Sequence, residues 1–211
     1  TANCGHPMKI LILVDWFPVL SETHILNRIT GLIERGHSVE ILANGPGETS
    51  LRQDGVSKHN LLESVTYYNL ADNRLAKAYH MAKSLLKQPL NMPLWKATND
   101  ILSRNGERRF QVFHSVAALS NSRNYDIIQC EFGPTGLTAL KLKQLGVLKG
   151  RLITSFRGYD ITGYLKTRPD VYSQLFADGD HFLPVCDAFR QKLLALGCQD
   201  SRITVQPAAI D

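Results

Sequence analysis

The first candidate for chemistry is a loop near the amino terminus that contains Phe17, Pro18, Ser21, Glu22 and Thr23. Ser21 or Thr23 could cap a following helix and leave its free N–H groups facing a ligand. Glu22 would complement the helix dipole whether or not it also binds a hydroxyl group. Capping alone explains the two hydroxyl side chains equally well.

The second candidate combines Gln129 and Glu131 with Gly133 and Gly136. The two polar residues occupy alternate positions at the end of a predicted strand, so their side chains should point to the same side. The glycines permit close approach of the backbone. A carboxylate at Glu131 could hydrogen-bond sugar hydroxyls or accept a proton. The alternative is that Glu131 is only an acidic residue at a helix N-terminus.

The third candidate follows the next strand and contains Arg157, Gly158, Tyr159 and Asp160. The planar guanidinium of Arg157 suits a phosphate or a carboxylate, because it donates to two oxygens at once. Asp160 could instead cap the next helix. Cys186 lies where a further helix begins, a position that can activate a thiol, although packing or capping is the favoured explanation.

Several common enzyme signatures do not occur. The sequence has no GxGxxG and no GxxxxGK[ST] pattern, which disfavours a typical dinucleotide-binding dehydrogenase and a P-loop NTPase. HExxH and GxSxG are also missing. The four cysteines form no CxxC pair, so we expect neither a disulfide framework nor a zinc site. We expect no metal and no cofactor.

Alternating strand and helix patterns position these segments. Ile10–Val14 and Val39–Leu42 flank a helical segment that Gly36 stops, and this βαβ unit implies parallel pairing. Further strands are predicted at Val65–Leu70, Asp126–Cys130, Leu152–Phe156, His181–Val185 and Ile203–Gln206. Further helices are predicted at Asn73–Leu86, Leu94–Leu102, Arg109–Leu119, Gly133–Gly146, Asp170–Phe176 and Asp187–Leu196. The predicted fold is therefore α/β, a Rossmann-like, doubly wound, mostly parallel sheet with helices on both faces.

Length and charge set further bounds. At 211 residues and 44% hydrophobic composition, the chain suits one large domain. No apolar run is long enough for a membrane span or a signal-peptide core, so we expect a cytoplasmic protein. The net charge of +5 is modest, but basic residues gather between Arg74 and Arg109, where only Asp100 and Glu107 oppose them. This region could meet an anionic membrane, a phosphorylated ligand or nucleic acid, although a solvated helix face is the simpler account.

Taken together, these segments resemble the amino-terminal half of family 4 glycosyltransferases, which are retaining enzymes of the GT-B fold. The family typically reads FPxxSETFI, and this chain has FPVLSETHI at Phe17–Ile25. DIIQCEFGPTG at Asp126–Gly136 is similar to the family's DxIHxHFGxxG, and FRGYD at Phe156–Asp160 is similar to FHGYD. The weaker matches are Gly36–Val39, Val185–Asp187, Leu196-Gly197 and Pro207–Asp211. The resemblance spans the chain from Met8.

The departures from the family pattern affect the predicted site. Where the family has two histidines around the fourth strand, this chain has Gln129 and Glu131. Where it has a histidine near the reacting sugar, this chain has Arg157. An arginine there could bind a phosphate or an acidic acceptor, but it stays protonated and is a poor general base.

The resemblance implies a short leader at residues 1–7 and an acceptor-side domain at residues 8–211. The family's donor-binding domain would follow Asp211, so we expect this chain alone to be inactive. The whole enzyme would transfer a sugar, with retention of configuration, from a nucleotide-sugar to a saccharide or lipid-linked acceptor in surface polysaccharide biosynthesis. The expected catalytic residues are Arg157 and Glu131. The expected acceptor-side residues are Phe17, Pro18, Ser21, Glu22, Thr23, Gln129, Gly133, Gly136, Gly158, Tyr159, Asp160 and Cys186.

Two other functions stay open at this point. A nucleotide-sugar epimerase can use the same architecture and needs no acceptor. A non-catalytic saccharide-binding module would fit the loss of the family histidines. Peripheral contact with the inner face of a membrane, through residues 74–109, is a further hypothesis, and nucleic acid is not an expected partner.

Overall fold

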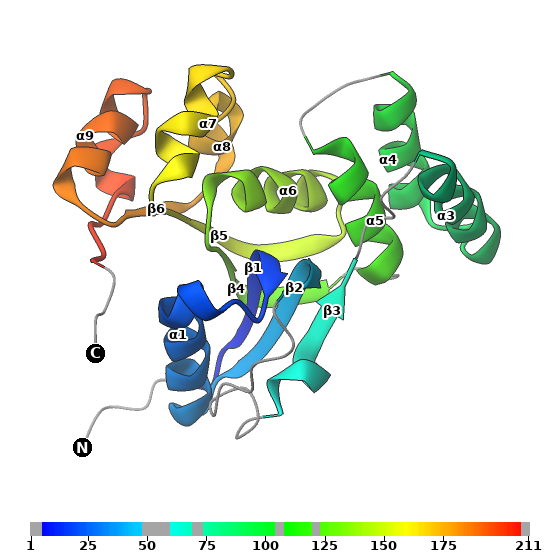
Figure 1. Cartoon of the computed structure of the whole chain (residues 1–211), viewed down its shortest axis with the longest axis horizontal. Coiled ribbons are helices and arrows are strands. Elements are labelled where there is room, and N and C mark those ends of the chain that lie inside the picture. The colour runs from blue at the N-terminus through cyan, green and yellow to red at the C-terminus, as the bar shows by residue number, and fades with distance from the viewer. Residues whose placement is uncertain (1–5, 48–59, 69–73, 104–107, 120–122, 208–211) are drawn as a thin grey trace.

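The computed structural model describes residues 6–47, 60–68, 74–103, 108–119 and 123–207. Its strands are β1 (Lys9–Phe17), β2 (Ser38–Pro46), β3 (Val65–Tyr67), β4 (Arg123–Cys130), β5 (Leu148–Phe156) and β6 (His181–Pro184). They form one six-stranded sheet in the order β3-β2-β1-β4-β5-β6 (Figure 1). All neighbouring strands are parallel, and the strand order reverses between β1 and β4. The predicted α/β fold with a doubly wound sheet is therefore confirmed.

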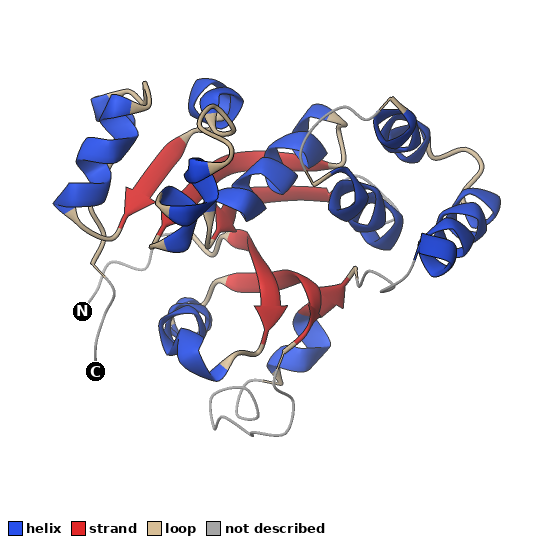
Figure 2. Cartoon of the chain, turned by 45° about the horizontal axis from the view of Figure 1, so that its top comes forward, coloured by secondary structure: helices blue, strands red, loops and turns tan. Residues whose placement is uncertain are grey.

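Helices lie on both sides of this sheet (Figure 2). They are α1 (Thr23–Glu34), α3 (Arg74–Lys87), α4 (Met92–Leu102), α5 (Arg109–Leu119), α6 (Gly133–Gln144), α7 (Gly163–Lys166), α8 (Ser173–Asp178) and α9 (Asp187–Ala195). Helix α1 covers one face through a core that includes Ile10 and Ile12. Helices α4, α5 and α6 cover the other face, where Leu11 and Leu13 belong to the larger core. Among the described residues, no helix is both long and apolar enough to cross a bilayer.

Burial on both faces explains the unbroken apolar sequence of β1. Every residue from Ile10 to Val14 is buried, with successive side chains entering opposite cores. A central parallel strand therefore reads as a continuous hydrophobic run rather than as an alternation. Each buried Leu or Ile contributes about 1.5–3 kcal/mol.

The helix stops predicted from glycine are also confirmed. Gly36 and Gly146 follow α1 and α6 with φ angles of 85° and 75°. This left-handed conformation ends a helix at little steric cost only when the residue is glycine. The amide of Gly36 donates to the Ile33 carbonyl oxygen at 2.9 Å, which closes the last turn of α1.

The structure corrects some predicted boundaries. Ile203–Gln206 does not form a strand, because it makes only one isolated bridge, between Ile203 and Phe182 of β6. The segment still runs beside β6, since the Gln206 amide donates to the Pro184 carbonyl oxygen at 2.9 Å. Helix α8 begins at Ser173 rather than at Asp170. The end of the third predicted strand, at Leu70, lies outside the described residues.

Candidate functional site

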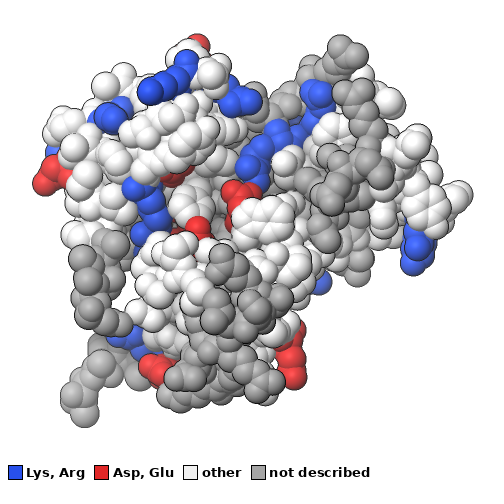
Figure 3. Space-filling model, viewed as in Figure 1, with Lys and Arg blue, Asp and Glu red and all other residues white. Residues whose placement is uncertain are grey.

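Charged side chains gather where β1, β4 and β5 end. Figure 3 shows a hollow on the face viewed in Figure 1, with acidic and basic side chains on its walls. Glu22, at the start of α1, feels the charges of Asp15, Glu131 and Arg157. Ligands of parallel α/β sheets bind at the carboxyl ends of the strands. This edge of the sheet is therefore our candidate site.

At the base of the cluster, Glu131 is held by two arginines. Its carboxylate is fully buried. Oε1 accepts a hydrogen bond from Nη1 of Arg28 in α1, and Oε2 accepts one from Nη2 of Arg157 after β5, each at 2.7 Å. A buried carboxylate is stable only when it is paired in this way. Both oxygens are thus occupied by protein groups.

This arrangement changes the role expected for Glu131. The carboxylate has no exposed surface and both of its oxygens are bound by arginines, so it is not presented to a ligand. In this structure Glu131 holds the guanidinium of Arg157 in place. The side chains of Gln129 and Glu131 both form hydrogen bonds with β5 or with the loop after it. Gln129 is buried, and its Nε2 donates to Oγ of Ser155 at 2.9 Å.

Arg157 has spare donor capacity. Only 11% of its side chain is exposed, and its buried Nε has no hydrogen-bond partner among the described residues. The partner arginine, Arg28, also donates through Nη2 to Oε1 of Gln206 at 2.9 Å. The segment that ends the described chain is therefore linked through Arg28 and Glu131 to the loop that carries Arg157.

Asp160 organises that loop. It is 3% exposed, and its carboxylate accepts hydrogen bonds from the amides of Arg157 (3.1 Å), Gly158 (2.8 Å) and Ile161 (3.1 Å). It also accepts one from the amide of Gly133, at 3.2 Å, which joins the loop to the start of α6. The carboxylate is thus engaged in ordering the backbone, close to the capping alternative, rather than presented to a ligand.

The glycines at the start of α6 are required for packing. A Cβ atom at Gly133 would lie 2.4 Å from the hydroxyl oxygen of Tyr172, and one at Gly136 would lie 2.8 Å from the side chain of Thr154. The hydroxyl of Tyr172 donates to the Asp160 carbonyl oxygen at 2.9 Å. The close approach predicted for these glycines is therefore an approach to other parts of the protein.

The loop between β1 and α1 divides into buried and exposed parts. Phe17 and Pro18 are buried, and a cis peptide bond joins them. Ser21 and Thr23 are exposed, and neither caps α1. The capping prediction is wrong because a turn of 3₁₀-helix runs directly into α1, which makes Glu22 the N-cap residue, without a side-chain cap.

The pKa values of Glu22 and His24 are shifted in this site. Burial raises the pKa of Glu22 to about 6, helped by the negative charges of Asp15 and Glu131 and opposed by Arg157. Burial, with the positive charge of Arg157, lowers the pKa of His24. The Nε2 atom of His24 is buried without a hydrogen-bond partner in the described part of the chain. A carboxyl group with a pKa near 6 can give or take a proton close to neutral pH.

No spacing rule in the sequence marks His24 as functional. It has no ligand-like spacing to another histidine, and it follows the SET motif at a position where the family pattern has Phe. Only the fold brings its side chain close to Arg157 and Glu131.

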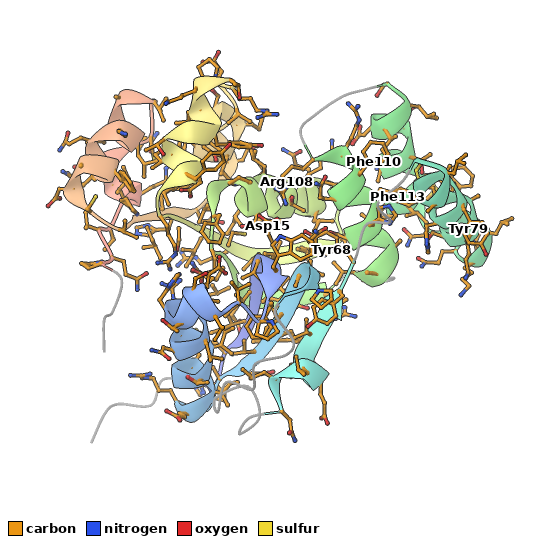
Figure 4. The ribbon with its side chains drawn as sticks, in the orientation of Figure 1. Asp15, Tyr68, Tyr79, Arg108, Phe110 and Phe113 are labelled. Carbon is orange, nitrogen blue, oxygen red and sulfur yellow. The ribbon has the colours of Figure 1, made fainter. Side chains whose placement is uncertain are left out.

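Arg108 also lies at this edge, contrary to its predicted place in the basic surface of residues 74–109. Figure 4 shows Arg108, Asp15 and Tyr68 close together. Nη2 of Arg108 donates to the carboxylate of Asp15, and Nε donates to Oγ1 of Thr138 at 3.1 Å. Its guanidinium also hydrogen-bonds the side chain of Tyr68. Arg108 is thus an internal tie between β1, the end of β3 and α6.

The remaining predicted residues lie at the same edge of the sheet but outside the charged cluster. Tyr159 is 74% exposed, and the space beside the Cα atom of Gly158 is open. Both are therefore free to meet a ligand. Cys186 follows β6, where its carbonyl oxygen accepts hydrogen bonds from the amides of Phe189 (3.1 Å) and Arg190 (3.0 Å). Cys186 is thus the N-cap residue of α9, but its side chain makes no capping hydrogen bond.

A separate cavity of about 540 Å³ lies between α4, α5, α6 and residues 168–174. Its lining contains none of the predicted site residues. Two of its charged lining residues neutralise each other, because Nζ of Lys141 forms an ion pair with Oδ2 of Asp100 at 2.8 Å. We place the site at the strand ends, where the shifted carboxyl and the arginine with spare donors lie together.

The curated relatives that this chain resembles are named as glycosyltransferases. The family model for Glycosyltransferase Family 4 matches residues 21–211. The putative colanic acid biosynthesis glycosyltransferase WcaL of Salmonella typhimurium is 34% identical over 209 residues, covering 97% of this chain and 51% of WcaL. The amylovoran biosynthesis glycosyltransferase AmsK of Erwinia amylovora is 32% identical over 211 residues, covering 97% and 51%. The chain spans about half the length of these curated relatives.

Two solved structures share the fold. A glycosyltransferase from Rickettsia africae superposes with a TM-score of 0.53 at 15% identity, covering 98% of this chain and 44% of that one. HepE from Anabaena, solved in complex with UDP-glucose, gives a TM-score of 0.56 at 13% identity, covering 97% and 44%. At these identities the likeness shows the fold alone.

Neutralising the buried carboxylate should destabilise the protein strongly. We expect Glu131→Gln to lower the free energy of unfolding by about 3–5 kcal/mol, because two largely buried guanidinium groups lose their counter-charge. Urea unfolding measures the loss. Glu40→Gln is the matched control, since Glu40 also contacts two cations, Lys9 and Arg123 at 2.9 Å each, but is partly exposed. Glu40→Gln should lower the free energy of unfolding by about 1 kcal/mol or less. Equal losses of stability in the two variants would contradict our account.

The shifted carboxyl should make stability depend on pH. Folding raises the pKa of Glu22 from its ordinary 4.5 to about 6, so the folded protein holds a proton that the unfolded chain releases in that interval. The wild type should therefore lose stability relative to Glu22→Gln as the pH rises from about 4.5 through about 6. Below about pH 4.5, wild type and Glu22→Gln should have the same free energy of unfolding, because Glu22 is then protonated in both the folded and the unfolded state. Urea unfolding at several pH values measures this, with the exposed Glu63→Gln as control. A difference that does not change with pH would count against it.

Proposed function

Because the chain belongs to glycosyltransferase family 4, we propose that it is the acceptor-side domain of a retaining glycosyltransferase. The whole protein would transfer a sugar from a nucleotide-sugar to a saccharide or lipid-linked acceptor, without a metal cofactor. The curated relatives are named for colanic acid and amylovoran biosynthesis, which supports a role in surface polysaccharide assembly. We propose that a further domain binds the donor, and that this chain alone is inactive.

The observation that carries this proposal is the cluster of Glu22, His24 and Arg157 at the strand ends. In the transfer, the acceptor oxygen would bond to the anomeric carbon on the face from which the nucleoside diphosphate departs, so that configuration is retained, and the proton of the acceptor hydroxyl would pass to the carboxylate of Glu22. Glu22 would hydrogen-bond the acceptor hydroxyl, since its raised pKa lets it hold or take a proton near neutral pH. His24, held neutral by burial and by Arg157, would accept a second hydrogen bond from the acceptor.

Arg157 would supply fixed positive charge in the cleft. Its guanidinium stays protonated and can donate to an anionic acceptor group or to the departing diphosphate. Glu131 and Arg28 hold that guanidinium in place, and Asp160 orders the loop that carries it. A charge fixed in this way stabilises the transition state more than a charge on a mobile side chain would, because it needs no reorganisation during the reaction.

We also propose that the enzyme works at the inner face of the membrane, in contact with it through part of residues 74–109. A lipid-linked acceptor would be presented there. The burial of Arg108 restricts the contact to the part of this region that precedes it.

Substitution of Arg157 in the full-length protein tests the transfer role. We expect Arg157→Ala to lower kcat for sugar transfer about 100-fold, in the range found when one transition-state donor is removed. Arg157→Lys, which keeps the charge but not the fork, should restore only part of the rate. Release of the nucleoside diphosphate with and without acceptor, together with product analysis, gives the measurement.

The control is Arg151→Ala, an exposed arginine on β5, the strand that precedes Arg157, and it should leave kcat unchanged. Unfolding curves for each variant separate loss of chemistry from loss of fold. Conversion of the nucleotide-sugar in the absence of any acceptor would favour the epimerase instead. Full transfer activity in Arg157→Ala would remove Arg157 from the mechanism.

A further inference from the structure

Helix α3 carries an apolar stripe that no described residue covers. Leu75, Tyr79, Ala82 and Leu86 recur at helical spacing and so lie on one face. The two leucines are 85% and 81% exposed and the tyrosine 62%. Figure 4 shows Tyr79 at the outer edge of the molecule, away from the sheet.

This stripe is not the face that anchors the helix. Met81 and Leu85 pack against the main core and are only partly buried. They lie about a quarter to a third of a turn around the helix from the exposed stripe. An ordinary surface helix has one apolar face, directed inward. Helix α3 has a second one, directed outward.

Further exposed apolar side chains follow α3 in the chain, in the turn before α4 and in the first turn of that helix. Leu90, Met92 and Trp95 are 92%, 63% and 47% exposed. The indole Nε1 of Trp95 donates to the Pro89 carbonyl oxygen at 2.9 Å, so its polar atom is satisfied while the ring stays at the surface. Several exposed apolar side chains in one region mark an interaction site, and tryptophan favours the boundary between lipid and water.

The charges beside the stripe are positive. Helix α3 contains no acidic residue. Lys83 and Lys87 are exposed on one flank of the stripe, and Lys83 Nζ lies 5.7 Å from the ring centroid of Tyr79. Lys96 is exposed on α4. The nearby Asp100 does not cancel these charges, because it is paired with Lys141 at 2.8 Å.

We propose that the outer surface of residues 75–96 docks on an anionic lipid bilayer. The stripe of Leu75, Tyr79 and Leu86 would enter the boundary between headgroups and acyl chains, while Lys83 and Lys87 meet anionic headgroups. This inference rests on the membrane contact of the proposed function. It adds the residues that make the contact and the anionic charge of the lipid they meet.

The charge pattern favours lipid over a second copy of the chain. A two-fold contact through this face would set the lysines of one α3 against those of the other, with no acidic partner on the helix. Like charges held together in this way are destabilising. An anionic bilayer instead complements both the apolar stripe and the lysines on its flank.

Binding of the full-length protein to vesicles tests the docking surface. The probe is phosphatidylglycerol mixed with phosphatidylcholine, compared with phosphatidylcholine alone. We expect Leu75→Gln and Leu86→Gln to weaken partitioning about tenfold each, from the loss of a buried leucine side chain. Lys83→Gln and Lys87→Gln should each weaken it about fivefold at low salt and less at high salt. Glutamine is chosen because it preserves helix propensity.

The matched controls are Leu62→Gln and Lys149→Gln. Leu62 is 53% exposed on another part of the surface, and Lys149 is exposed at the start of β5. Neither should change vesicle binding, and unfolding curves should show that every variant is folded. Transfer to a water-soluble acceptor without vesicles should be the same in the α3 variants and the wild type, so failure of docking and failure of the transfer function are separable.

Three outcomes would overturn the proposal. Vesicle binding by Leu75→Gln/Leu86→Gln equal to that of the wild type would show that the stripe does not enter lipid. An equal loss in Leu62→Gln would show that any exposed leucine suffices. A wild type that ignores anionic vesicles but changes oligomeric state when the stripe is substituted would show that a second copy covers this face.

Discussion

The buried carboxylate of Glu131 constrains the mutual placement of three parts of the molecule. It lies directly after β4 and receives one arginine from α1 and one from the loop after β5, each at 2.7 Å. A charge this deep costs several kcal/mol of desolvation unless its partners are held in place. The first helix, the central sheet and the Arg157 loop must therefore assemble together, and the candidate site is built on that assembly.

The same contacts set the electrostatics of the hollow. Burial, helped by the negative charges of Asp15 and Glu131, raises the pKa of Glu22 to about 6. Arg157 opposes this shift, and burial together with the charge of Arg157 lowers the pKa of His24. The site thus presents a carboxyl group that can hold a proton, a neutral imidazole and a permanent cation within one small region. Such a combination suits a neutral hydroxyl beside an anionic leaving group.

The basic segment between β3 and β4 has two distinct parts. Arg108 turns inward, joins Asp15 and Tyr68, and belongs to the site. Helix α3 lies at the outer edge of the molecule (Figure 1). Its outward face leaves apolar side chains and lysines exposed. Charge counted along the sequence does not separate these parts, because a buried, paired arginine and an exposed lysine contribute equally to the count.

The sequence by itself determined the parallel sheet, the helix stops and the edge where the site lies. These follow from local patterns, such as the apolar run Ile10–Val14 and the left-handed glycine at Gly36, and each pattern acts within a few residues. Only the tertiary structure decided what the polar residues do. Arg28 and Glu131 are 103 residues apart, and Glu131 and Arg157 are 26 apart. Burial and charge pairing over such separations depend on the fold. The fold therefore makes Glu131 a buried, paired charge, Asp160 a backbone tie, and Glu22 the carboxyl group with the raised pKa.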